Sequence, residues 1–343
     1  MTTDFWKKLI EWHNRQQRTL PWDNERDPYK VWVSEIMLQQ TVVAAALDHY
    51  KKWMDRFPRV EDLAQAEEPE VLRLWEGLGY YSRVRNLLKA AKQIVSTGIF
   101  PETYDQWRDL PGIGDYTASA ILAFSGDQPY LTLDANLKKV FQRLEGHREW
   151  TVETEARWRA RMGAAFREFS PRELNLSLMH LGQLLCSSQN PDCLACPLSP
   201  LCQAKALGIQ NQIPTKKTLE TEAGEEWPVV ISRDGWILME SPQTGRFQGQ
   251  WIFPSGPAGW WFDAFGSALE IQGNLTNQVH SYTKFRITLH PQAALWNSQV
   301  LFVAEAPPGR ERQWVRREDL GQLPVPSVYR KIIDEYLGNL FYG

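Results

Sequence analysis

The spacing of apolar residues changes once along the chain, and this change constrains the fold more than any other feature. Before about residue 208, apolar side chains recur at intervals of three and four, the spacing of one face of an α-helix. Alternation typical of strands is nearly absent there. We therefore predict a mostly α-helical first domain over residues 1–208. Its clearest predicted helices lie at 29–41, 71–75, 118–124, 137–144 and 174–185.

The pattern beyond residue 208 is different. The stretch 209–227 is polar and holds a glutamate-rich run, so we predict a linker. Two short apolar runs at 229–232 and 236–239 then flank Asp234-Gly235, a dipeptide typical of a β-hairpin turn. The second domain, 228–343, is therefore expected to be α+β. Its other predicted elements are strands at 282–289 and 300–304 and helices at 261–269 and 328–337.

Composition excludes several classes of protein. Hydrophobic residues make up 43% of the chain and charged residues 23%, which is ordinary for a globular protein and excludes disorder, collagen and coiled coil. No run approaches the roughly 20 apolar residues that cross a bilayer. Residues 1–20 are too polar for a signal peptide. We expect a cytoplasmic protein of bacterial type, a monomer, with no membrane partner.

Net charge does not mark this chain as a nucleic-acid binder. It has 38 basic and 41 acidic residues, a net charge of −3. Up to Lys217 the counts are 28 and 27, and beyond it they are 10 and 14, so the total hides only a mild asymmetry. Any binding of phosphate groups must therefore depend on local patches, such as Lys138-Lys139, and on backbone N–H groups.

All four cysteines lie in one short segment, in the pattern C-x6-C-x2-C-x5-C. Four thiolates so close in sequence can enclose one metal centre. Disulfides are disfavoured in a cytoplasmic chain. Structural zinc sites usually use two C-x2-C pairs, and irregular spacing suits an iron–sulfur cluster, but spacing alone leaves zinc open. The four candidate ligands are Cys186, Cys193, Cys196 and Cys202.

Two glycines and a later aspartate form the next candidate site. Gly112 and Gly114, in Leu-Pro-Gly-Ile-Gly, allow a tight turn before a helix whose first N–H groups can hold a phosphate. A plain turn between helices is the alternative. The string resembles the helix-hairpin-helix of DNA glycosylases, in which an aspartate follows further along the chain. Here that residue is Asp134, either a helix N-cap or a carboxylate that stabilises an oxocarbenium-like sugar.

Glu35 lies in an apolar stretch of a predicted helix, beside Trp32 and Ile36. Most glutamates are exposed, so a solvated side chain is the simpler interpretation. The apolar neighbours instead indicate partial burial, which raises the pKa of a carboxyl group and suits a general acid. We therefore predict that Glu35 is the acid of a glycosidic cleavage in which Asp134 stabilises the sugar.

Four further segments carry a broader resemblance. They are Arg-Thr-Leu-Pro-Trp at 18–22, Pro-Tyr-Lys-Val-Trp at 28–32, Ser-Glu-Ile-Met-Leu-Gln-Gln-Thr at 34–41 and Gly-Leu-Gly-Tyr-Tyr-Ser-Arg at 77–83. With the hairpin and the cysteine loop, they resemble the MutY family of helix-hairpin-helix glycosylases, which excise adenine from DNA. The resemblance implies a [4Fe-4S] cluster on the four cysteines. It also implies double-stranded DNA with a mismatch or an oxidised guanine as the partner.

The resemblance implies catalytic roles for individual residues. Glu35 would be the general acid and Asp134 the charge-stabilising or nucleophilic carboxylate, with Tyr116 and Asn136 assisting. Bifunctional relatives carry, at the position of Tyr116, a lysine that forms a Schiff base with the sugar. A phenol cannot form an imine. We therefore predict base removal without efficient strand cleavage.

The resemblance also implies contacts with DNA. Gln40 and Tyr80 would enter the duplex as wedges, which suits an enzyme that extrudes a base. Gln40 and Thr41 would lie near the opposite lesion. Core packing is the commoner fate of an aromatic residue such as Tyr80, although its glycine-flanked loop favours the wedge. The extruded base would lie among Arg18, Leu20, Trp22 and Glu35.

The second domain resembles the Nudix-like domain of the same family around Gly-Gln-Trp-Ile-Phe-Pro at 249–254. The glutamate-rich metal-binding helix of working Nudix hydrolases has no counterpart here, so nucleotide hydrolysis is not expected. In the family this domain helps to recognise 8-oxoguanine through a Phe-Ser-His-like loop. The matching residues are Tyr282, Thr283 and Lys284, and the lysine adds a charge in place of histidine.

His180 departs from the family pattern, which carries an acidic residue there that accepts from the amino group of adenine. A helix histidine bonded to a backbone carbonyl is the simpler interpretation. If His180 faces the base pocket, the base preference is altered.

We predict a monofunctional glycosylase that excises adenine opposite 8-oxoguanine or guanine in base excision repair. The alternatives are a glycosylase for another mismatched base, such as thymine opposite guanine, and a lesion-binding protein with little catalysis.

Overall fold

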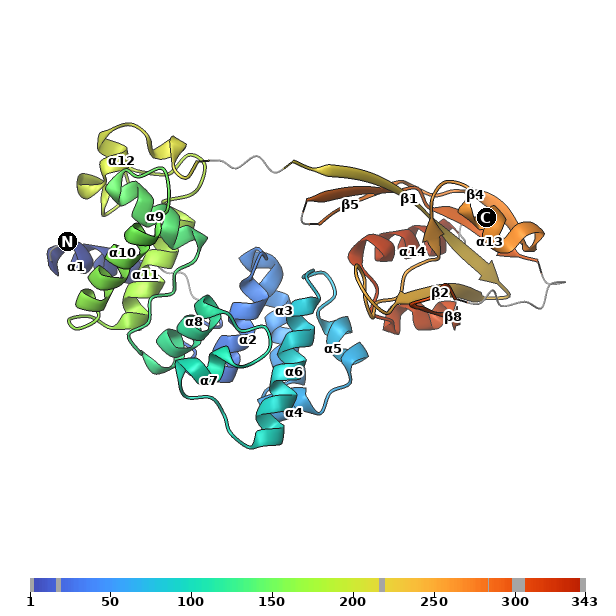
Figure 1. Cartoon of the computed structure of the whole chain (residues 1–343), viewed down its shortest axis with the longest axis horizontal. Helices are drawn as coiled ribbons and strands as arrows, with labels where there is room; N and C mark the ends of the chain where they lie inside the picture. The colour runs from blue at the N-terminus through green and yellow to red at the C-terminus, as the bar shows by residue number, and fades with distance from the viewer. Residues whose placement is uncertain (1–2, 17–19, 216–219, 283, 298–305, 340–343) are drawn as a thin grey trace. The chain divides into compact units, whose positions relative to one another are not determined.

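The computed structural model describes residues 3–16, 20–215, 220–282, 284–297 and 306–339. The chain forms two compact units, shown in Figure 1. The first unit comprises Met1–Gln65 and Asn86–Lys217, and the second comprises Ala66–Arg85 and Thr218–Gly343. The units are therefore not two consecutive halves of the chain, because one short segment of the helical part clusters with the second unit.

The chain before residue 213 is helical, as its periodicity predicts (Figure 1). The predicted helices are present, with slightly different bounds. No helix among the described residues has an apolar stretch long enough to span a membrane. The helices are α1 (Thr3–Asn14), α2 (Pro28–Leu38), α3 (Val43–Arg56), α4 (Val60–Ala64), α5 (Glu68–Leu74), α6 (Ser82–Thr97), α7 (Tyr104–Arg108), α8 (Asp115–Gly126), α9 (Ala135–Glu145), α10 (Val152–Ala165), α11 (Pro171–Leu184) and α12 (Gln203–Ala206), with 3-10 turns at Ser199–Leu201 and Gln210–Gln212.

Two sets of helix contacts form the core of the first unit. Helices α1, α9, α10 and α11 share one cluster of buried apolar side chains, in which Phe141 stacks on Trp158 with ring centroids 3.9 Å apart. Helix α2 packs against α8. It begins with Pro28 after Asp27, whose side chain accepts a hydrogen bond from the backbone N–H of Tyr29 at 2.9 Å. Nearly all of α2 is buried, so any polar group that it carries is removed from water.

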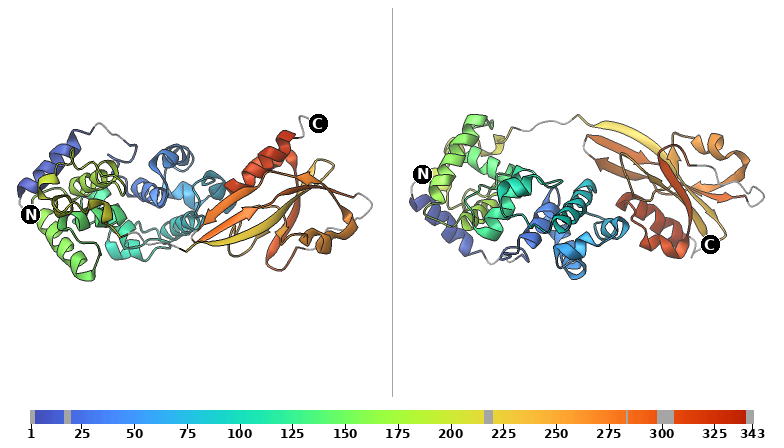
Figure 2. Two further views of the ribbon diagram at one scale, coloured as in Figure 1. Left: turned by 90° about the horizontal axis from the view of Figure 1, so that it is seen from above. Right: turned by 60° about the horizontal axis from the view of Figure 1, so that its bottom comes forward.

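The second unit contains α5 and a mixed sheet of eight strands among its described residues. The central strand β1 is parallel to β6 and β7 and antiparallel to β2. The sheet elements are β1 (Glu222–Arg233), β2 (Trp236–Pro242), β3 (Ser255–Gly256), β4 (Leu269–Asn274), β5 (Gln278–Tyr282), β6 (Phe285–Leu289), β7 (Gln292–Trp296) and β8 (Arg310–Arg316). Helices α13 (Trp260–Phe265) and α14 (Ser327–Asn339) and 3-10 turns at Gly266–Ala268 and Arg317–Gln322 complete it (Figure 2).

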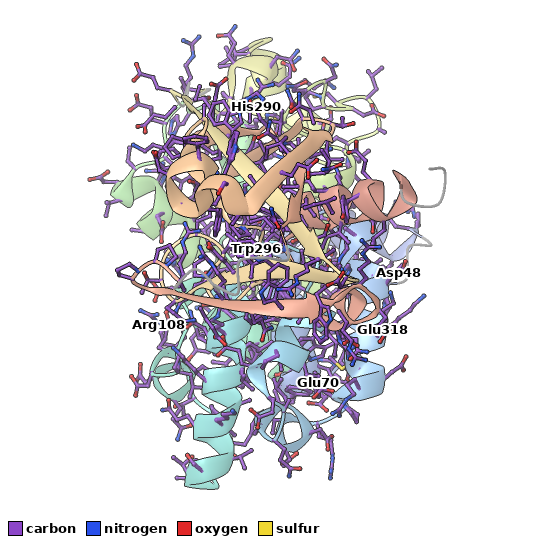
Figure 3. The ribbon with its side chains drawn as sticks, turned by 90° about the vertical axis from the view of Figure 1, so that its right-hand side faces the viewer. Asp48, Glu70, Arg108, His290, Trp296 and Glu318 are labelled. Atoms are coloured by element: carbon purple, nitrogen blue, oxygen red, sulfur yellow. The ribbon has the colours of Figure 1, made fainter. Side chains whose placement is uncertain are left out.

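Alternate residues of β1 face two separate apolar clusters. Val230 packs in the cluster that contains α14, whereas Val229 and Ile231 pack in the cluster that contains Phe265 of α13. Trp296, labelled in Figure 3, belongs to the second cluster and lies edge-on to Phe265 at 5.8 Å. Both faces of the sheet are therefore covered, as the two-residue period of a strand requires.

The hairpin predicted at Asp234-Gly235 is confirmed, because Arg233 pairs with Trp236 across the turn. Asp234 and Gly235 have φ values of +47° and +84°, and positive φ at both positions is the geometry of a type I′ turn.

The prediction of one strand over 282–289 is wrong. Two strands meet there in a tight turn, with Tyr282 paired to Phe285, and the segment has no glycine or proline to signal that turn. Strand β1 begins at Glu222, inside the stretch predicted as a linker. The strand predicted at 300–304 lies outside the described residues.

Candidate active site

Helix α2 carries Glu35 into the interior, where only 5% of the residue is exposed. The hydroxyl of Tyr116, from α8, donates a hydrogen bond to Glu35 Oε2 at 2.8 Å. Burial raises the pKa of Glu35 to about 7, the Tyr116 hydrogen bond lowers it, and the negative charge of Asp134 raises it. This carboxyl group can therefore hold a proton near neutral pH and give it up to a substrate.

Asp134 is the N-cap of α9, and its partly buried carboxylate lies close enough to act electrostatically on Glu35, although it does not line the cavity beside Glu35. Its Oδ1 accepts from the backbone N–H of Leu137 at 2.7 Å, and its Oδ2 accepts from the side-chain amide of Asn136 at 3.0 Å. Burial raises the pKa of Asp134, and these two hydrogen bonds oppose that rise. The two interpretations of Asp134 are therefore compatible, since capping the helix also fixes the carboxylate.

Lys139, expected with Lys138 to form a patch for phosphate groups, is buried instead, so that expectation is wrong for Lys139, which is a positioning residue. Its Nζ is buried and donates to Asn136 Oδ1 at 3.1 Å and to the carbonyl of Gly182 at 3.2 Å. Because the ammonium holds the oxygen of the Asn136 amide, the NH₂ group is turned toward Asp134. No local sequence signal marks this role, because the carbonyl of Gly182 comes from a distant segment.

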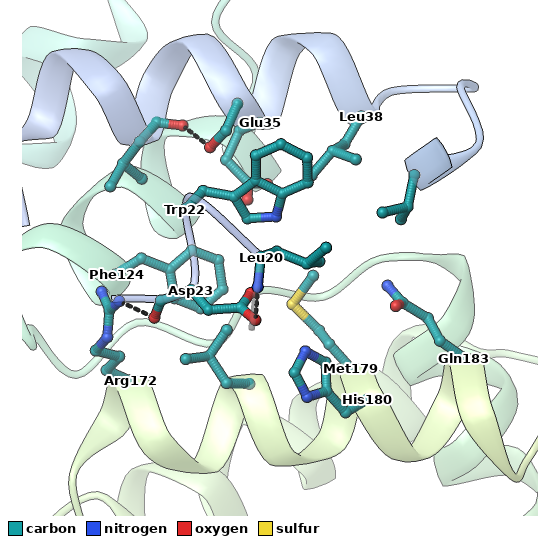
Figure 4. Close-up of a pocket in the computed structure, with 14 residues that line it drawn as sticks. Leu20, Trp22, Asp23, Glu35, Leu38, Phe124, Arg172, Met179, His180 and Gln183 are labelled. Carbon is teal, nitrogen blue, oxygen red and sulfur yellow. Dashed lines mark hydrogen bonds between the residues drawn. The ribbon is translucent and has the colours of Figure 1, made fainter. Parts of the chain in front are cut away.

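A cavity lies beside Glu35, between α2 and α11. Figure 4 shows Glu35 and Leu38 on one helix facing Arg172, Met179, His180 and Gln183 on the other, with Leu20, Trp22 and Asp23 on the loop between them. Four of the predicted pocket residues, Leu20, Trp22, Glu35 and His180, thus line one cavity. Arg18, predicted to join them, lies outside the described residues.

His180 is 5% exposed, and its ring lies 4.8 Å from that of His13. The cavity therefore presents imidazole, carboxylate and guanidinium groups together, since Asp23 and Arg172 also line it. Arg172 donates to the carbonyl of Glu25 at 3.0 Å and to that of Asp23, which fixes the loop over the cavity. Sequence reasoning missed Asp23 and Arg172, because they come from distant segments and belong to no motif.

The glycine hairpin adopts the tight turn expected from its sequence. Gly112 has φ of +78°, and a Cβ there would lie 2.6 Å from Cβ of Asn86, so both the backbone conformation and the space require glycine. Gly114 is the exposed N-cap of α8 and has open space around it. The first residue of α8, Asp115, forms an ion pair with Arg108 at 2.7 Å. Free N–H groups and a carboxylate therefore share this helix end.

The two predicted wedges have unusual backbones. Gln40, directly after the C-cap of α2, has φ of +57°, and Tyr80 has φ of +47°. Left-handed conformations in such residues cost roughly 1–3 kcal/mol each and concentrate at functional sites. Both residues are exposed, and Thr41 beside Gln40 is half-buried, with its hydroxyl donating to the Gln39 carbonyl at 3.3 Å. Strain and exposure fit side chains that act on a partner rather than in the core.

The four cysteine thiols line one small cavity, together with Arg143 and Lys205. Arg143 is 1% exposed, and its Nη1 lies 3.3 Å from Cys186 Sγ. The same guanidinium donates to the carbonyls of Ser187, at 2.7 Å, and Ser188, at 3.2 Å. Arg143 therefore fixes the start of the cysteine loop and offers a buried positive charge to thiolates.

Burial raises the pKa of Cys196 to about 11 and also raises the pKa of Cys193 and Cys202. Within the described residues, no three His, Cys, Asp or Glu side chains form a group that could hold a single metal ion. Four thiols surround one cavity, and a guanidinium lies beside them. These groups suit an anionic metal–thiolate centre, because a metal that binds to thiols displaces their protons.

Tyr282 and Lys284, two of the predicted lesion-recognition residues, lie between the end of β5 and the start of β6 in the second unit. Tyr282 lines a cavity together with Tyr80, Arg246, Phe247 and His280. The guanidinium of Arg246 lies over the rings of Phe247 and Tyr282, at 4.8 Å and 5.2 Å. Arg246 and Phe247 were not predicted, because they come from a loop far from the hairpin in sequence.

Lys284 is exposed and pairs with Glu222 at the start of β1, so its charge is partly balanced. It does not line the cavity that Tyr282 lines. Thr283, the third predicted residue, lies outside the described residues.

Comparison with known proteins relates these features to one family. The model of the HhH-GPD superfamily base excision DNA repair protein matches residues 33–163, which include Glu35, the glycine hairpin and Asp134. Adenine DNA glycosylase of Buchnera aphidicola subsp. Baizongia pistaciae (strain Bp) is 34% identical over 259 residues, 74% of each chain. Adenine DNA glycosylase of Mus musculus is 38% identical over 320 residues, 74% of this chain and 60% of the mouse protein.

A solved structure has the same helical fold. A thermostable thymine-DNA glycosylase superposes with a TM-score of 0.55 and 25% identity, over 60% of this chain and 96% of that one. The buried acid, the capped carboxylate and the glycine hairpin described above all lie in the part of the chain that the superfamily model matches. The chain therefore belongs to the adenine DNA glycosylase family.

Proposed function

We propose that this chain removes adenine from mispaired duplex DNA by cleaving the N-glycosidic bond, as the first step of base excision repair. The observation that carries the proposal is the buried Glu35, whose pKa is raised to about 7 beside a cavity. A general acid with a pKa near the working pH is the group that this cleavage needs, because adenine leaves poorly as an anion.

The carboxyl groups of Glu35 and Asp134 have different proposed roles. Glu35 accepts a hydrogen bond from Tyr116 and, with a pKa of about 7, keeps its proton in about half of the molecules at neutral pH. It can give that proton to a ring nitrogen of the extruded base. Asp134 accepts two hydrogen bonds at the N-terminus of α9, and both favour its ionised form. An ionised Asp134 stabilises the positive charge that develops on the sugar as the bond breaks.

Strand cleavage is not part of the proposed activity. Tyr116, at the position where bifunctional relatives carry lysine, donates a hydrogen bond to Glu35 and has no amine to form an imine. No lysine lines the base cavity among the described residues. The buried ammonium of Lys139 is already held by Asn136 and the Gly182 carbonyl.

We assign recognition of 8-oxoguanine, or of guanine, to the second unit. Tyr282 supplies an aromatic face beside Arg246 and Phe247, Thr283 is proposed to supply a hydroxyl, and Lys284 an ammonium donor. The ammonium can donate to the O8 carbonyl that oxidation adds or to a phosphate group, but it cannot accept a hydrogen bond from N7–H as a neutral histidine can. Gln40, Thr41 and Tyr80 are proposed to fill the duplex beside the lesion.

We further propose that Cys186, Cys193, Cys196 and Cys202 hold a [4Fe-4S] cluster. Such a cluster would cross-link the loop that follows α11, and Arg143 would offset its negative charge. The acid, the carboxylate and the cavity all belong to one chain, so the proposed enzyme acts as a monomer. Its four free thiols suit the reducing cytoplasm.

Excision of thymine is the second candidate function. His180 in the base cavity and the structural likeness to a thymine-DNA glycosylase at 25% identity favour it. An imidazole can donate to a carbonyl oxygen, which thymine offers and adenine lacks.

A panel of duplexes separates these functions. Single-turnover assays with A, T, U or G opposite 8-oxoguanine or guanine are expected to release adenine, because a ring nitrogen of adenine can accept the Glu35 proton. Release of thymine alone would favour the second function. Tight binding of every duplex without release would instead identify a lesion-binding protein.

Replacing Glu35 by glutamine removes the proton donor and keeps the size of the side chain. Adenine release is expected to fall by about 10²–10⁴-fold. In the unmodified protein Glu35 is protonated below a pH of about 7 and ionised above it, so the single-turnover rate should fall as pH rises through that value. Glu35→Gln should lose this dependence, whereas Glu11→Gln, on the exposed face of α1, should keep rate and profile. A rate independent of pH in the unmodified protein contradicts the role.

Asp134→Asn tests the carboxylate without removing the helix cap, because asparagine is an equally good N-cap. We expect binding of the mispaired duplex, measured by fluorescence anisotropy, to remain and base release to be lost. Asp48→Asn, on the exposed side of α3 and labelled in Figure 3, makes the same chemical change away from the site and should retain activity. Turnover by Asp134→Asn at the normal rate would show that Asp134 only caps the helix.

The metal centre is tested by elemental analysis of the purified protein. We expect about four iron atoms per chain and a broad visible absorption. The double change Cys193→Ser and Cys196→Ser should abolish both, whereas Ser188→Ala in the same loop should not. Stoichiometric zinc with no visible absorption would establish a zinc site instead.

A further inference from the structure

The segment Ala66–Arg85 clusters with the second unit although it lies within the helical part of the sequence. It ends in the loop 77–80, which carries the proposed wedge Tyr80. Gly77, Gly79 and Tyr80 have φ values of +101°, +69° and +47°. Glycine adopts a positive φ without strain, but the left-handed conformation of Tyr80 is strained and persists only where its surroundings hold it. The contacts that hold this loop therefore decide where the wedge lies.

Some of these contacts come from the ends of the loop itself. The indole N–H of Trp75 donates to the carbonyl of Gly79 at 3.0 Å. The guanidinium of Arg83 donates to the carbonyls of Leu78 and Gly79, at 3.0 Å and 3.2 Å, and lies 5.5 Å from the centroid of the Tyr80 ring. These contacts fix the shape of the loop but not its position on the rest of the unit.

Two contacts tie the segment to the rest of the unit: Arg85 donates to the carbonyl of Gln248, and an ion pair with α14 lies directly beside the loop. Arg330 forms a two-pronged ion pair with Glu76, the residue before the loop, with Nε–Oε1 and Nη2–Oε2 distances of 2.8 Å and 3.1 Å. Its remaining N–H groups donate to the carbonyls of Leu320 at 2.8 Å and Leu323 at 3.0 Å. The guanidinium is therefore oriented before it meets Glu76. Both side chains are only 21% exposed, so water screens the pair less than a surface pair.

The same unit joins the loop to the lesion-recognition hairpin. One cavity is lined by Tyr80 from the loop and by Arg246, Phe247 and Tyr282 from the sheet part. Helix α14 is held on the sheet by buried Val328, Ile332 and Ile333, so its packing does not depend on the ion pair. The Arg330–Glu76 pair is thus positioned to set the distance between wedge and hairpin rather than to build the core.

We infer that Arg330 is a positioning residue for base extrusion. Through Glu76 it holds the loop 77–80 at a fixed place relative to the hairpin tip, so that Tyr80 enters the duplex when the hairpin engages the opposite base. Neither residue contacts the departing base. The inference rests on the proposed function for its substrate, but the position of the wedge is measurable without base release.

A double-mutant cycle tests the inference. Arg330→Gln, Tyr80→Ala and the double variant are compared in single-turnover release of adenine opposite 8-oxoguanine. We expect Arg330→Gln to slow release about tenfold. It should have no further effect when Tyr80 is already alanine, because the effects of substituting two residues that act through one element are not additive. Lys331→Gln removes the neighbouring exposed charge of α14 and should change nothing.

A second readout is the fluorescence of 2-aminopurine placed next to 8-oxoguanine, which rises when a wedge unstacks it. Arg330→Gln should reduce this rise while thermal unfolding stays unchanged. If Arg330→Gln fails to fold, Arg330→Lys gives the same comparison, because lysine keeps the positive charge but cannot form the two-pronged ion pair with Glu76. Additive losses in the cycle, or a normal fluorescence rise in Arg330→Gln, overturn the inference. Absence of adenine release by the unmodified protein overturns the proposed function instead, and the fluorescence still decides the role of Arg330.

Discussion

The hydrogen bond from Tyr116 to Glu35 joins two helices at the point where the chemistry depends on their packing. An ionised carboxylate in that position would lack the water that it needs, so α2 and α8 can pack closely only around a protonated or hydrogen-bonded group. Close packing of the two helices and acid catalysis therefore both require that the carboxyl group of Glu35 is protonated or hydrogen-bonded. Glu35 also lines the base cavity, and the negative charge of Asp134 acts on its carboxyl group.

Helix α9 serves the site along its length. Its N-cap is the carboxylate, its first turns hold Asn136 and Lys139, and its last turn carries Arg143 to the cysteine loop. A short helix therefore connects the reacting end of the site to the proposed metal centre through side chains spaced about one turn apart. Displacement of this helix would disturb both places together.

Much of the fold could be predicted because helix periodicity and the Asp-Gly turn are local signals. The burial of Glu35 could be predicted from its apolar neighbours, and the glycine hairpin from its string of residues. Lys139, Asp23 and Arg246 could not, because each gains its role only from residues distant in sequence. The turn within 282–289 was missed for another reason: no glycine or proline marks it, and the pairing of β5 with β6 forms it. The roles of Arg18 and Thr283 stay predictions.

Asp115 places a negative charge beside the backbone N–H groups at the start of α8, where the glycine hairpin would hold a phosphate. A phosphate that approaches the N-terminus of α8 meets N–H groups favourable to it and, beside them, a carboxylate already paired with Arg108. Binding there exchanges one anion for another on the same guanidinium, so few counterions are released from the DNA and the gain in entropy is small. In the proposed enzyme, this helix end is therefore expected to add little salt-dependent affinity for DNA.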